Sequence, residues 1–301
     1  MKIIFMGTPD YASEILSEII SQGIEVVAVY TQPDKPVGRK KIMTAPPVKS
    51  LALKHSIKVC QPAKLRESDV VDEVLGIECD FIVVAAYGQI LPKEILEHAP
   101  CINLHASVLP QYRGASPIQQ TLLNGDKITG VTAMLMDEGL DSGDIIKIET
   151  IEVDEDMMLE ELFVRLTSLA SSLTIDVLKN FKNYKPIKQD ISKVTHCKKI
   201  TKADGVVDFD NALKIYNKYR AFTPWPGIFL ESGLKLKKIK LENKATKYES
   251  AKIIEISKES FVVGCAVGSI RVFSLQAPSK KETDAISYIN GKRLGVEDYL
   301  T

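Results

Sequence analysis

Three polar side chains near the middle of the sequence could act together on one carbonyl group. Asn103 and His105 are two residues apart, and Asp141 follows within the acidic segment 137–144. A carboxamide can donate hydrogen bonds to a developing oxyanion, and an imidazole can carry a proton near neutral pH. An aspartate beside that imidazole would orient it. These residue types predict transfer of an acyl or formyl group to an amine.

The residues around Asn103 predict how these side chains are presented. Residues 100–104 are mostly apolar, which is typical of a short strand. Side chains alternate along a strand, so Asn103 and His105 should share one face. A helix is predicted to begin near residues 116–117, with a serine as N-cap and a proline in the first turn. His105 should therefore lie at the carboxyl end of a strand, where open α/β sheets bind their ligands.

Each of these residues also has an ordinary structural interpretation. Asn103 could cap a turn, and His105 could be a surface or core residue at the end of a strand. Asp141 and Ser107 could be turn residues that bond locally. Taken one at a time, the residues leave both interpretations open.

Apolar segments alternate with helical patterns through the first 181 residues. Strands are predicted at 2–6, 25–30, 57–60, 80–86, 100–104, 129–136 and 144–153, and helices at 10–21, 48–54, 92–98 and 159–181. Such alternation predicts a doubly wound, mostly parallel α/β sheet, a Rossmann-like domain. Residues 31–47 hold four prolines and four basic residues and are predicted to form a loop.

A second domain is predicted after a polar, lysine-rich stretch. Residues 1–188 would form the catalytic domain, residues 189–206 a linker and residues 207–301 a C-terminal domain. After a helix at 212–220, five short β-like segments follow within about 50 residues, which is typical of a small OB-type β-barrel. The segments are 228–231, 235–241, 251–257, 261–266 and 269–275.

Charge is distributed unevenly, although the chain carries 39 basic and 39 acidic residues. Residues 193–301 have 20 Lys and Arg against 12 Asp and Glu, a net charge of +8. Residues 1–192 have 19 against 27, a net charge of −8. A basic C-terminal part hints at contact with nucleic acid, but a solvated lysine face would give the same pattern.

Several classes of protein are disfavoured by the composition. The five cysteines and four histidines show no metal-ligand spacing, so we expect no metal and a reducing compartment. No apolar run approaches the roughly 20 residues that span a membrane, so we expect no membrane partner. The first residues predict a strand rather than a signal peptide, and we expect a cytoplasmic protein. The turn 7–10 lacks the second and third glycines of the dinucleotide fingerprint, and it lacks the lysine of a phosphate-binding loop.

Longer motifs identify a family resemblance. The segments NLHASVLPQYRGASPI and GVTAMLMDEGLDSGDII resemble the signature of the folate-dependent formyltransferases. The similarity continues through IIFMGTPDYAS, TQPDKPVGR, VVAAYGQILP and RAFTPWPG, and is greatest to the members that formylate methionyl-tRNA. The resemblance implies that Asn103, His105 and Asp141 catalyse formyl transfer from 10-formyltetrahydrofolate to the α-amino group of methionyl initiator tRNA.

The binding residues are predicted partly from this resemblance. A pterin suits a narrow apolar slot with backbone donors and acceptors, and residues 86–91 and 137–141 are its expected walls. The resemblance adds residues 107–110. Ile90 and Leu91 could equally pack in the core. The predicted folate contacts are Ser107, Val108, Leu109, Pro110, Tyr87, Gly88, Gln89, Ile90, Leu91, Asp137 and Gly139.

The basic loop and the barrel are the predicted contacts for tRNA. In the family the loop enters the acceptor end, which implies contacts from Lys35, Arg39, Lys40 and Lys41; without the resemblance it could be a flexible solvated loop. Trp225 could stack on RNA or pack as a hinge between linker and barrel. We expect a monomer by analogy.

Two other classes of function stay open. One is another enzyme of the superfamily: a glycinamide-ribonucleotide transformylase, an amino-sugar formyltransferase or a formyltetrahydrofolate hydrolase. These should lack the basic loop and the basic barrel. The other is a nonenzymatic RNA-binding module, which would not need Asn103, His105 and Asp141 together.

Overall fold

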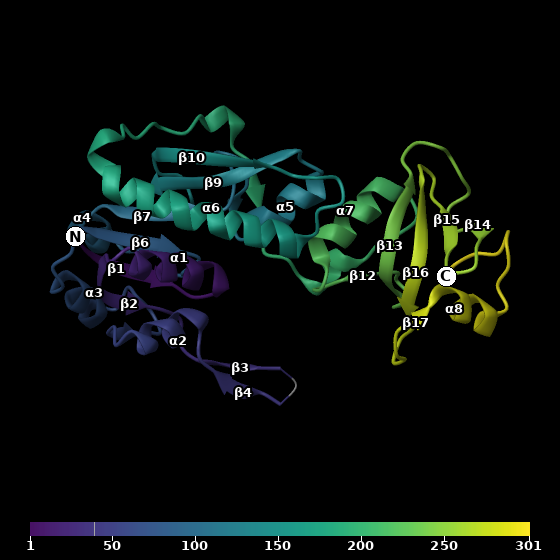
Figure 1. Ribbon diagram of the computed structural model, residues 1–301, viewed down its shortest axis with the longest axis horizontal. Coiled ribbons are helices and arrows are strands. Elements are labelled where there is room, and N and C mark those ends of the chain that lie inside the picture. The colour runs from purple at the N-terminus through teal and green to yellow at the C-terminus, as the bar shows by residue number, and fades with distance from the viewer. Residues whose placement is uncertain (39) are drawn as a thin grey trace. The chain divides into compact units, whose positions relative to one another are not determined.

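The computed structural model describes residues 1–38 and 40–301 and divides into two compact units, each with its own sheet (Figure 1). The first unit comprises Met1–Pro117, Ile128–Val153 and Glu160–Lys198. The second comprises Ile118–Lys127, Asp154–Leu159 and Lys199–Thr301. The division after Lys198 falls inside the predicted linker 189–206, and the assignment of functions to domains stays a prediction.

The first unit is built on a seven-stranded sheet of order β10-β9-β7-β6-β1-β2-β5. β5, β2, β1, β6 and β7 run parallel to one another, and β9 runs antiparallel to its two neighbours, β7 and β10. This confirms the doubly wound, mostly parallel sheet. The strands are β1 Lys2–Gly7, β2 Glu25–Tyr30, β5 Val59–Cys60, β6 Phe81–Ala85, β7 Cys101–His105, β9 Ile128–Leu135 and β10 Ile145–Glu152.

The strand order reverses between β1 and β6. The chain builds β1, β2 and β5 in one direction and then returns to place β6 and β7 on the other side of β1. Ligands of open α/β sheets bind at the carboxyl ends of the strands that flank such a reversal. The ends of β1, β6 and β7 therefore mark the edge where a site is expected.

Helices cover both faces of this sheet. α1 and α6 lie side by side on one face, where the rings of Tyr11 and Phe163 meet edge to face at 6.3 Å (Figure 1). On the other face α3 and α4 add Val74 and Ile95 to a buried cluster that includes Ile4. The helices of the first unit are α1 Asp10–Ser21, α2 Pro47–Lys54, α3 Ser68–Leu75, α4 Lys93–His98 and α6 Leu159–Asn180, with short 3-10 turns η1 Phe181–Asn183 and η2 Ile191–Lys193.

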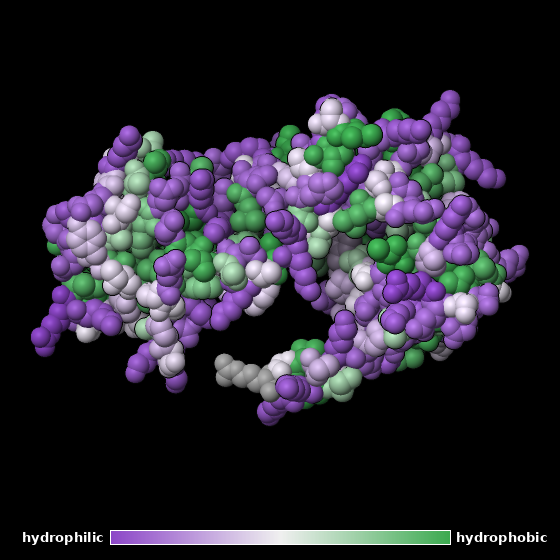
Figure 2. Space-filling view, turned by 180° about the vertical axis from the view of Figure 1, so that it is seen from behind, coloured by the Kyte–Doolittle hydropathy of each residue, from purple (hydrophilic) through white to green (hydrophobic). Residues whose placement is uncertain are grey.

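The predicted loop 31–47 contains a β-hairpin, so the prediction of a plain loop is wrong there. β3 Lys35–Val37 pairs antiparallel with β4 Ile42–Thr44. Val37 lies opposite Ile42, and both side chains are mostly exposed, as is that of Met43. Cross-strand pairing of these residues holds the hairpin, which has almost no core of its own. It projects from the sheet as an arm with hydrophobic as well as hydrophilic side chains (Figures 1 and 2).

The second unit is built on an antiparallel sheet of order β12-β13-β16-β15-β14, with β17 beside β16. It confirms the predicted β-rich C-terminal domain of the OB type. Its strands are β12 Ile228–Phe229, β13 Lys235–Asn243, β14 Ile253–Ile256, β15 Phe261–Gly264, β16 Ser269–Gln276 and β17 Thr283–Asp284. Its helices are η3 Lys202–Gly205, α7 Ala212–Phe222 and α8 Ala285–Lys292. α5 Pro117–Asn124 also belongs to this unit, except for its first residue, which ends a segment of the first unit. Over residues 1–38 and 40–301, no helix has both the length and the apolar character needed to cross a bilayer.

Candidate active site

The three predicted catalytic side chains meet at the carboxyl end of β7. Asn103 and His105 lie on β7, and Asp141 comes from the loop between β9 and β10. The Nδ2 atom of Asn103 donates to Asp141 Oδ1 at 3.3 Å, and His105 Nδ1 lies 3.6 Å from the same oxygen. The side chains of His105 and Asp141 are only 7% and 12% exposed. The cluster is therefore compact and largely shielded from water.

A tight turn of the backbone aims the Asp141 carboxylate. Asp141 has a left-handed φ of +50°, which costs an ordinary residue roughly 1–2 kcal/mol. Its second oxygen, Oδ2, accepts a hydrogen bond from the backbone N–H of Gly114 at 2.8 Å. Gly143, two residues on, allows the loop to fold against β9, because a Cβ there would lie 1.7 Å from the carbonyl oxygen of Leu135.

The position of its hydrogen bonds fixes the tautomer of His105. Its Nε2 atom lies 2.9 Å from the carbonyl oxygen of Tyr112. A carbonyl oxygen only accepts, so Nε2 must carry a proton. In the neutral ring, Nδ1 then holds the lone pair, and Nδ1 is the atom that faces Asp141. Proton exchange by His105 must therefore take place at Nδ1.

The predicted folate segment 107–110 bonds mainly within the protein. Ser107 is fully buried and its hydroxyl donates to the carbonyl oxygen of Gln111 at 2.6 Å. Leu109 is also buried, and its N–H donates to Thr132 Oγ1 at 3.0 Å. Val108 and Pro110 are partly exposed. Ser107 and Leu109 therefore shape the loop, and contact between the segment and folate stays a prediction.

The segment after β6 presents a mixture of exposed and buried residues. Ile90 is 79% exposed and Leu91 is 2% exposed, so the core interpretation describes Leu91 and not Ile90. Tyr87 is buried, whereas Gly88 is exposed at a φ of +83°. Gln89 is bound to the neighbouring loop, because its side chain accepts from the N–H of Leu65 at 2.7 Å. The exposed positions suit contact with a planar ligand.

Asp137 and Gly139, the remaining predicted folate residues, belong to one turn. The Asp137 carboxylate accepts from the N–H of Gly139 at 3.0 Å and from the hydroxyl of Ser142 at 2.7 Å. These bonds stabilise the first half of the loop that carries Asp141. Contact of Asp137 and Gly139 with folate stays a prediction.

The predicted tRNA contacts lie mainly on the hairpin. Lys35 is on β3, and Lys40 and Lys41 follow it in the turn, all three exposed. Arg39 lies outside the described residues. In the second unit, Trp225 is 59% exposed, and this exposure favours a surface role over tight packing.

The predicted linker contributes to the site, which the sequence interpretation missed. β11 His196–Cys197 pairs with β8 Arg113–Gly114, directly beside the turn that bonds Asp141. Gln189 also lies against the loop of Asp141, to which its side chain donates at 2.9 Å. Residues 189–198 show little periodicity, so the only available signal was their position after the last predicted helix of the α/β domain.

Comparison with known proteins decides the family. A family profile described as "Formyl transferase" matches residues 1–178, and one described as "Formyl transferase, C-terminal domain" matches residues 199–293.

The chain belongs to the formyl transferase family.

Its similarity to curated formyl transferases extends over the full length. The chain is 67% identical to the methionyl-tRNA formyltransferase of Sulfurimonas denitrificans, with 100% of both chains covered. It is 52% identical to the methionyl-tRNA formyltransferase of Campylobacter lari, with 99% of both chains covered.

Solved structures share the formyl transferase fold. An N-formyltransferase from Helicobacter canadensis, in complex with folinic acid and dTDP-3-aminofucose, has a TM-score of 0.70 at 20% identity, covering 91% of this chain and 99% of that one. HypX from Aquifex aeolicus, in complex with tetrahydrofolic acid, has a TM-score of 0.63 at 16% identity, covering 100% of this chain and 49% of that one. At these identities the likeness supports the fold alone.

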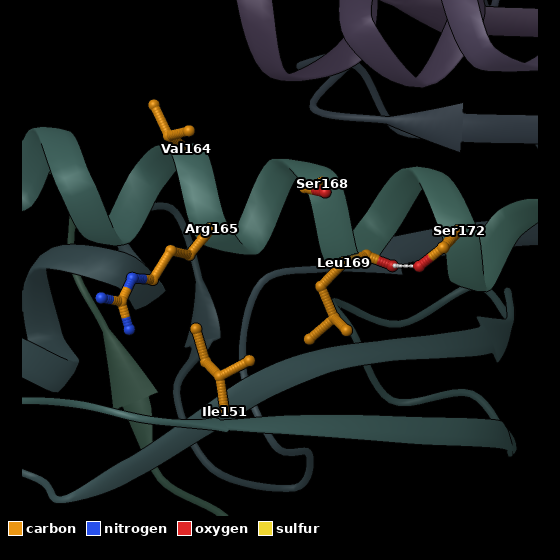
Figure 3. Close-up of a pocket in the computed structure, with 6 residues that line it drawn as sticks. All are labelled: Ile151, Val164, Arg165, Ser168, Leu169 and Ser172. Atoms are coloured by element: carbon orange, nitrogen blue, oxygen red, sulfur yellow. Dashed lines mark hydrogen bonds between the residues drawn. The ribbon is translucent and has the colours of Figure 1, made fainter.

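Other surface features lie apart from the cluster of Asn103, His105 and Asp141. A depression of about 410 Å³ lies between α6 and β10, and Figure 3 shows Arg165 and Leu169 pointing from α6 towards Ile151. Its lining includes no residue of the predicted site. Within the described part of the chain, no three His, Cys, Asp or Glu side chains are grouped so as to hold a metal ion.

Proposed function

We propose that this formyl transferase moves the formyl group of 10-formyltetrahydrofolate to the α-amino group of methionyl initiator tRNA. The products are formylmethionyl-tRNA, used in translation initiation, and tetrahydrofolate. The relatives named methionyl-tRNA formyltransferase, matched along the whole chain, support this substrate pair. The observation that carries the chemistry is the meeting of Asn103, His105 and Asp141 at one strand end.

Asn103 is placed to stabilise the oxyanion that forms when the amine attacks the formyl carbon. One of its N–H groups bonds to Asp141, and the carboxamide has a second N–H for the oxyanion. A donor aimed in this way is worth roughly 3 kcal/mol of barrier. The bond to Asp141 also limits rotation of the carboxamide, so the donor is oriented before the substrate arrives.

His105 and Asp141 handle the proton. The amine must lose one proton as it forms the new C–N bond, and the folate nitrogen must gain one as the old C–N bond breaks. Nδ1 of His105 is the accepting atom, and the Asp141 carboxylate beside it stabilises the imidazolium. A water held by Asp141 can relay the proton. A covalent formyl-enzyme is unnecessary, because the amine is itself the nucleophile.

The substrates fit different parts of the first unit. Exposed Gly88 and Ile90 offer backbone groups and an apolar side chain next to the catalytic edge, which suits a pterin. Lys40 and Lys41 on the arm offer charge for tRNA phosphates. The basic second unit would add further RNA contacts. We place the activity in the cytoplasm and expect the chain to act as a monomer.

An acceptor assay tests this proposal. Purified protein is given labelled 10-formyltetrahydrofolate and one of three acceptors: methionyl initiator tRNA, glycinamide ribonucleotide or a nucleotide-linked amino sugar. We expect formylation of the charged tRNA only. Formylation of either small acceptor, with none of the tRNA, would assign the chain to another branch of the family.

A further inference from the structure

The segment between the two family ranges is bonded to the catalytic loops. Residues 179–198 lie after the first matched range and before the second. Ile187 of this segment exchanges two backbone hydrogen bonds, of 2.8 and 2.9 Å, with Ile145 at the start of β10. The hydroxyl of Thr195 accepts from the N–H of Tyr112 at 2.9 Å. This segment therefore lies against both sides of the cluster: the loop of Asp141 and the turn that fixes His105.

Gln189 makes the most direct connection. It is 8% exposed, and its Nε2 atom donates to the carbonyl oxygens of Asp141, at 2.9 Å, and Gly143, at 2.8 Å. Its Oε1 atom accepts from Nε and Nη2 of Arg113, at 3.1 and 2.7 Å. An arginine can only donate, so the amide of Gln189 cannot be flipped without losing all four bonds.

These bonds close a ring around the carboxylate. Arg113 holds Gln189, Gln189 holds the backbone of Asp141, and the carboxylate of Asp141 accepts from Gly114, the residue that follows Arg113. The ring fixes Asp141 at both its carbonyl and its side chain. Asp141 adopts a left-handed φ, and these bonds stabilise that conformation.

We propose that Gln189 is a positioning residue for formyl transfer. It holds Asp141 in contact with Asn103 and His105, and Arg113 fixes the orientation of its amide. This inference rests on the proposed function, since it gives Gln189 a role through Asp141. Gln189 acts on the geometry of the catalytic cluster and does not touch the substrates.

Gln189→Glu is the sharpest single change. The two side chains have nearly the same shape, and a carboxylate still accepts from Arg113. It replaces the donor NH₂ by an oxygen facing the carbonyls of Asp141 and Gly143, so the loop must shift. We expect kcat to fall about 10-fold to 100-fold, as for other small displacements of catalytic groups, with KM for folate and for tRNA changed less than about 3-fold.

A matched control is available at the end of α1, just before β2 begins. The amide of Gln22 also bonds at both ends, donating to Glu18 Oε1 at 3.0 Å and accepting from Lys179 Nζ at 2.8 Å. Gln22→Glu should leave kcat unchanged. Circular dichroism melts of both variants establish that the fold persists.

Arg113→Met keeps the inference testable if Gln189→Glu folds poorly, and the ring signals of His105 give a second readout where it folds. Arg113→Met should lower kcat by a similar factor, and the double variant should be no slower than the slower single variant, because both act through one contact. The ¹⁵N signals of the His105 ring, assigned by loss in His105→Ala, should shift in Gln189→Glu and stay in place in Gln22→Glu.

The outcomes separate this inference from the proposed function. Normal kcat and unchanged ring signals in Gln189→Glu, alongside an inactive Asp141→Asn, would overturn the role of Gln189 and leave the formyl transferase chemistry standing. Normal kcat in Asp141→Asn itself would remove Asp141 from the mechanism, and the role of Gln189 with it.

Discussion

At the scale of single residues, the geometry of the cluster depends on how the polar atoms of His105 and Asp141 are partnered. The carbonyl oxygen of Tyr112 accepts a hydrogen bond from His105 Nε2, and the N–H of Gly114 donates one to Asp141 Oδ2. The other oxygen of Asp141, Oδ1, lies close to both Asn103 Nδ2 and His105 Nδ1. The orientation of Asn103 thus depends on one carboxylate oxygen, and the same oxygen faces the ring nitrogen of His105 that would accept a proton, which makes Asp141 the most sensitive of the three predicted catalytic positions.

Asp141→Asn is therefore expected to lower kcat by about 100-fold or more without unfolding the protein. The new side chain keeps its volume and can still accept from Gly114. It loses the charge that stabilises a protonated His105. Steady-state formyl transfer and a thermal melt measure the two effects. Asp69→Asn at the exposed start of α3 serves as control. Turnover within a few-fold of wild type would remove Asp141 from proton transfer.

At the scale of elements, amphipathic pattern and capping predict what is locally determined. The helix at Asp10–Ser21 and the strand at Glu25–Tyr30 have the predicted bounds, because each has an apolar face of the right period. α3 was missed, since it has only eight residues and four of them are serine or acidic. The hairpin was missed because its proline and its charges are typical of loops.

The catalytic site shows the same limit. Asn103 and His105 could be placed together from strand alternation alone, since they lie on one element. Their meeting with Asp141 needed the family resemblance, because it depends on how two loops fold over the sheet edge. Gln189 could not be predicted, as its partners are 46, 48 and 76 residues away and nothing periodic surrounds it.

The arm formed by β3 and β4 is expected to act in tRNA binding only. Changing Lys40 and Lys41 together to Ala removes two positive charges from an exposed turn. We expect KM for charged tRNA to rise about 10-fold at low salt and to depend less steeply on salt concentration. Folate affinity, measured by direct titration, should stay the same. An equal loss of folate affinity would show that the arm has been misassigned.

At the scale of the whole molecule, the second unit is assembled from three separate stretches of chain. Arg220 on α7 is buried and donates to the carbonyl oxygens of Asp154 and Met157, both at 3.3 Å. Asn217 on the same helix donates to Leu123 at 3.3 Å. The stretches 118–127 and 154–159 are thus bound into the unit through α7. A boundary drawn at residue 199 would remove the partners of these buried side chains.

An exposed ion pair network joins the same three stretches. Glu155 contacts Lys127 Nζ at 2.9 Å and Lys244 Nζ at 2.7 Å. The hydrogen bond from Lys244, followed by that from Lys127, lowers the pKa of Glu155 to about 2. In the unfolded chain the carboxyl would titrate near 4.3. Its stabilising effect is therefore complete above the unfolded pKa and is lost as the pH falls towards the folded one.

Glu155→Gln should consequently lower the thermal stability at neutral pH and make it depend less on pH in the acidic range. The difference in midpoint temperature between wild type and this variant should be largest above about pH 5 and shrink steadily towards about pH 2, because only the wild type takes up a proton at this position on unfolding. Added salt should reduce the difference at neutral pH, since the lysines and the carboxylate are exposed. Thermal melts across this range measure it, with Glu231→Gln on an exposed turn of the second unit as control. A difference that stayed constant with pH would mean that Glu155 contributes through packing rather than through its charge.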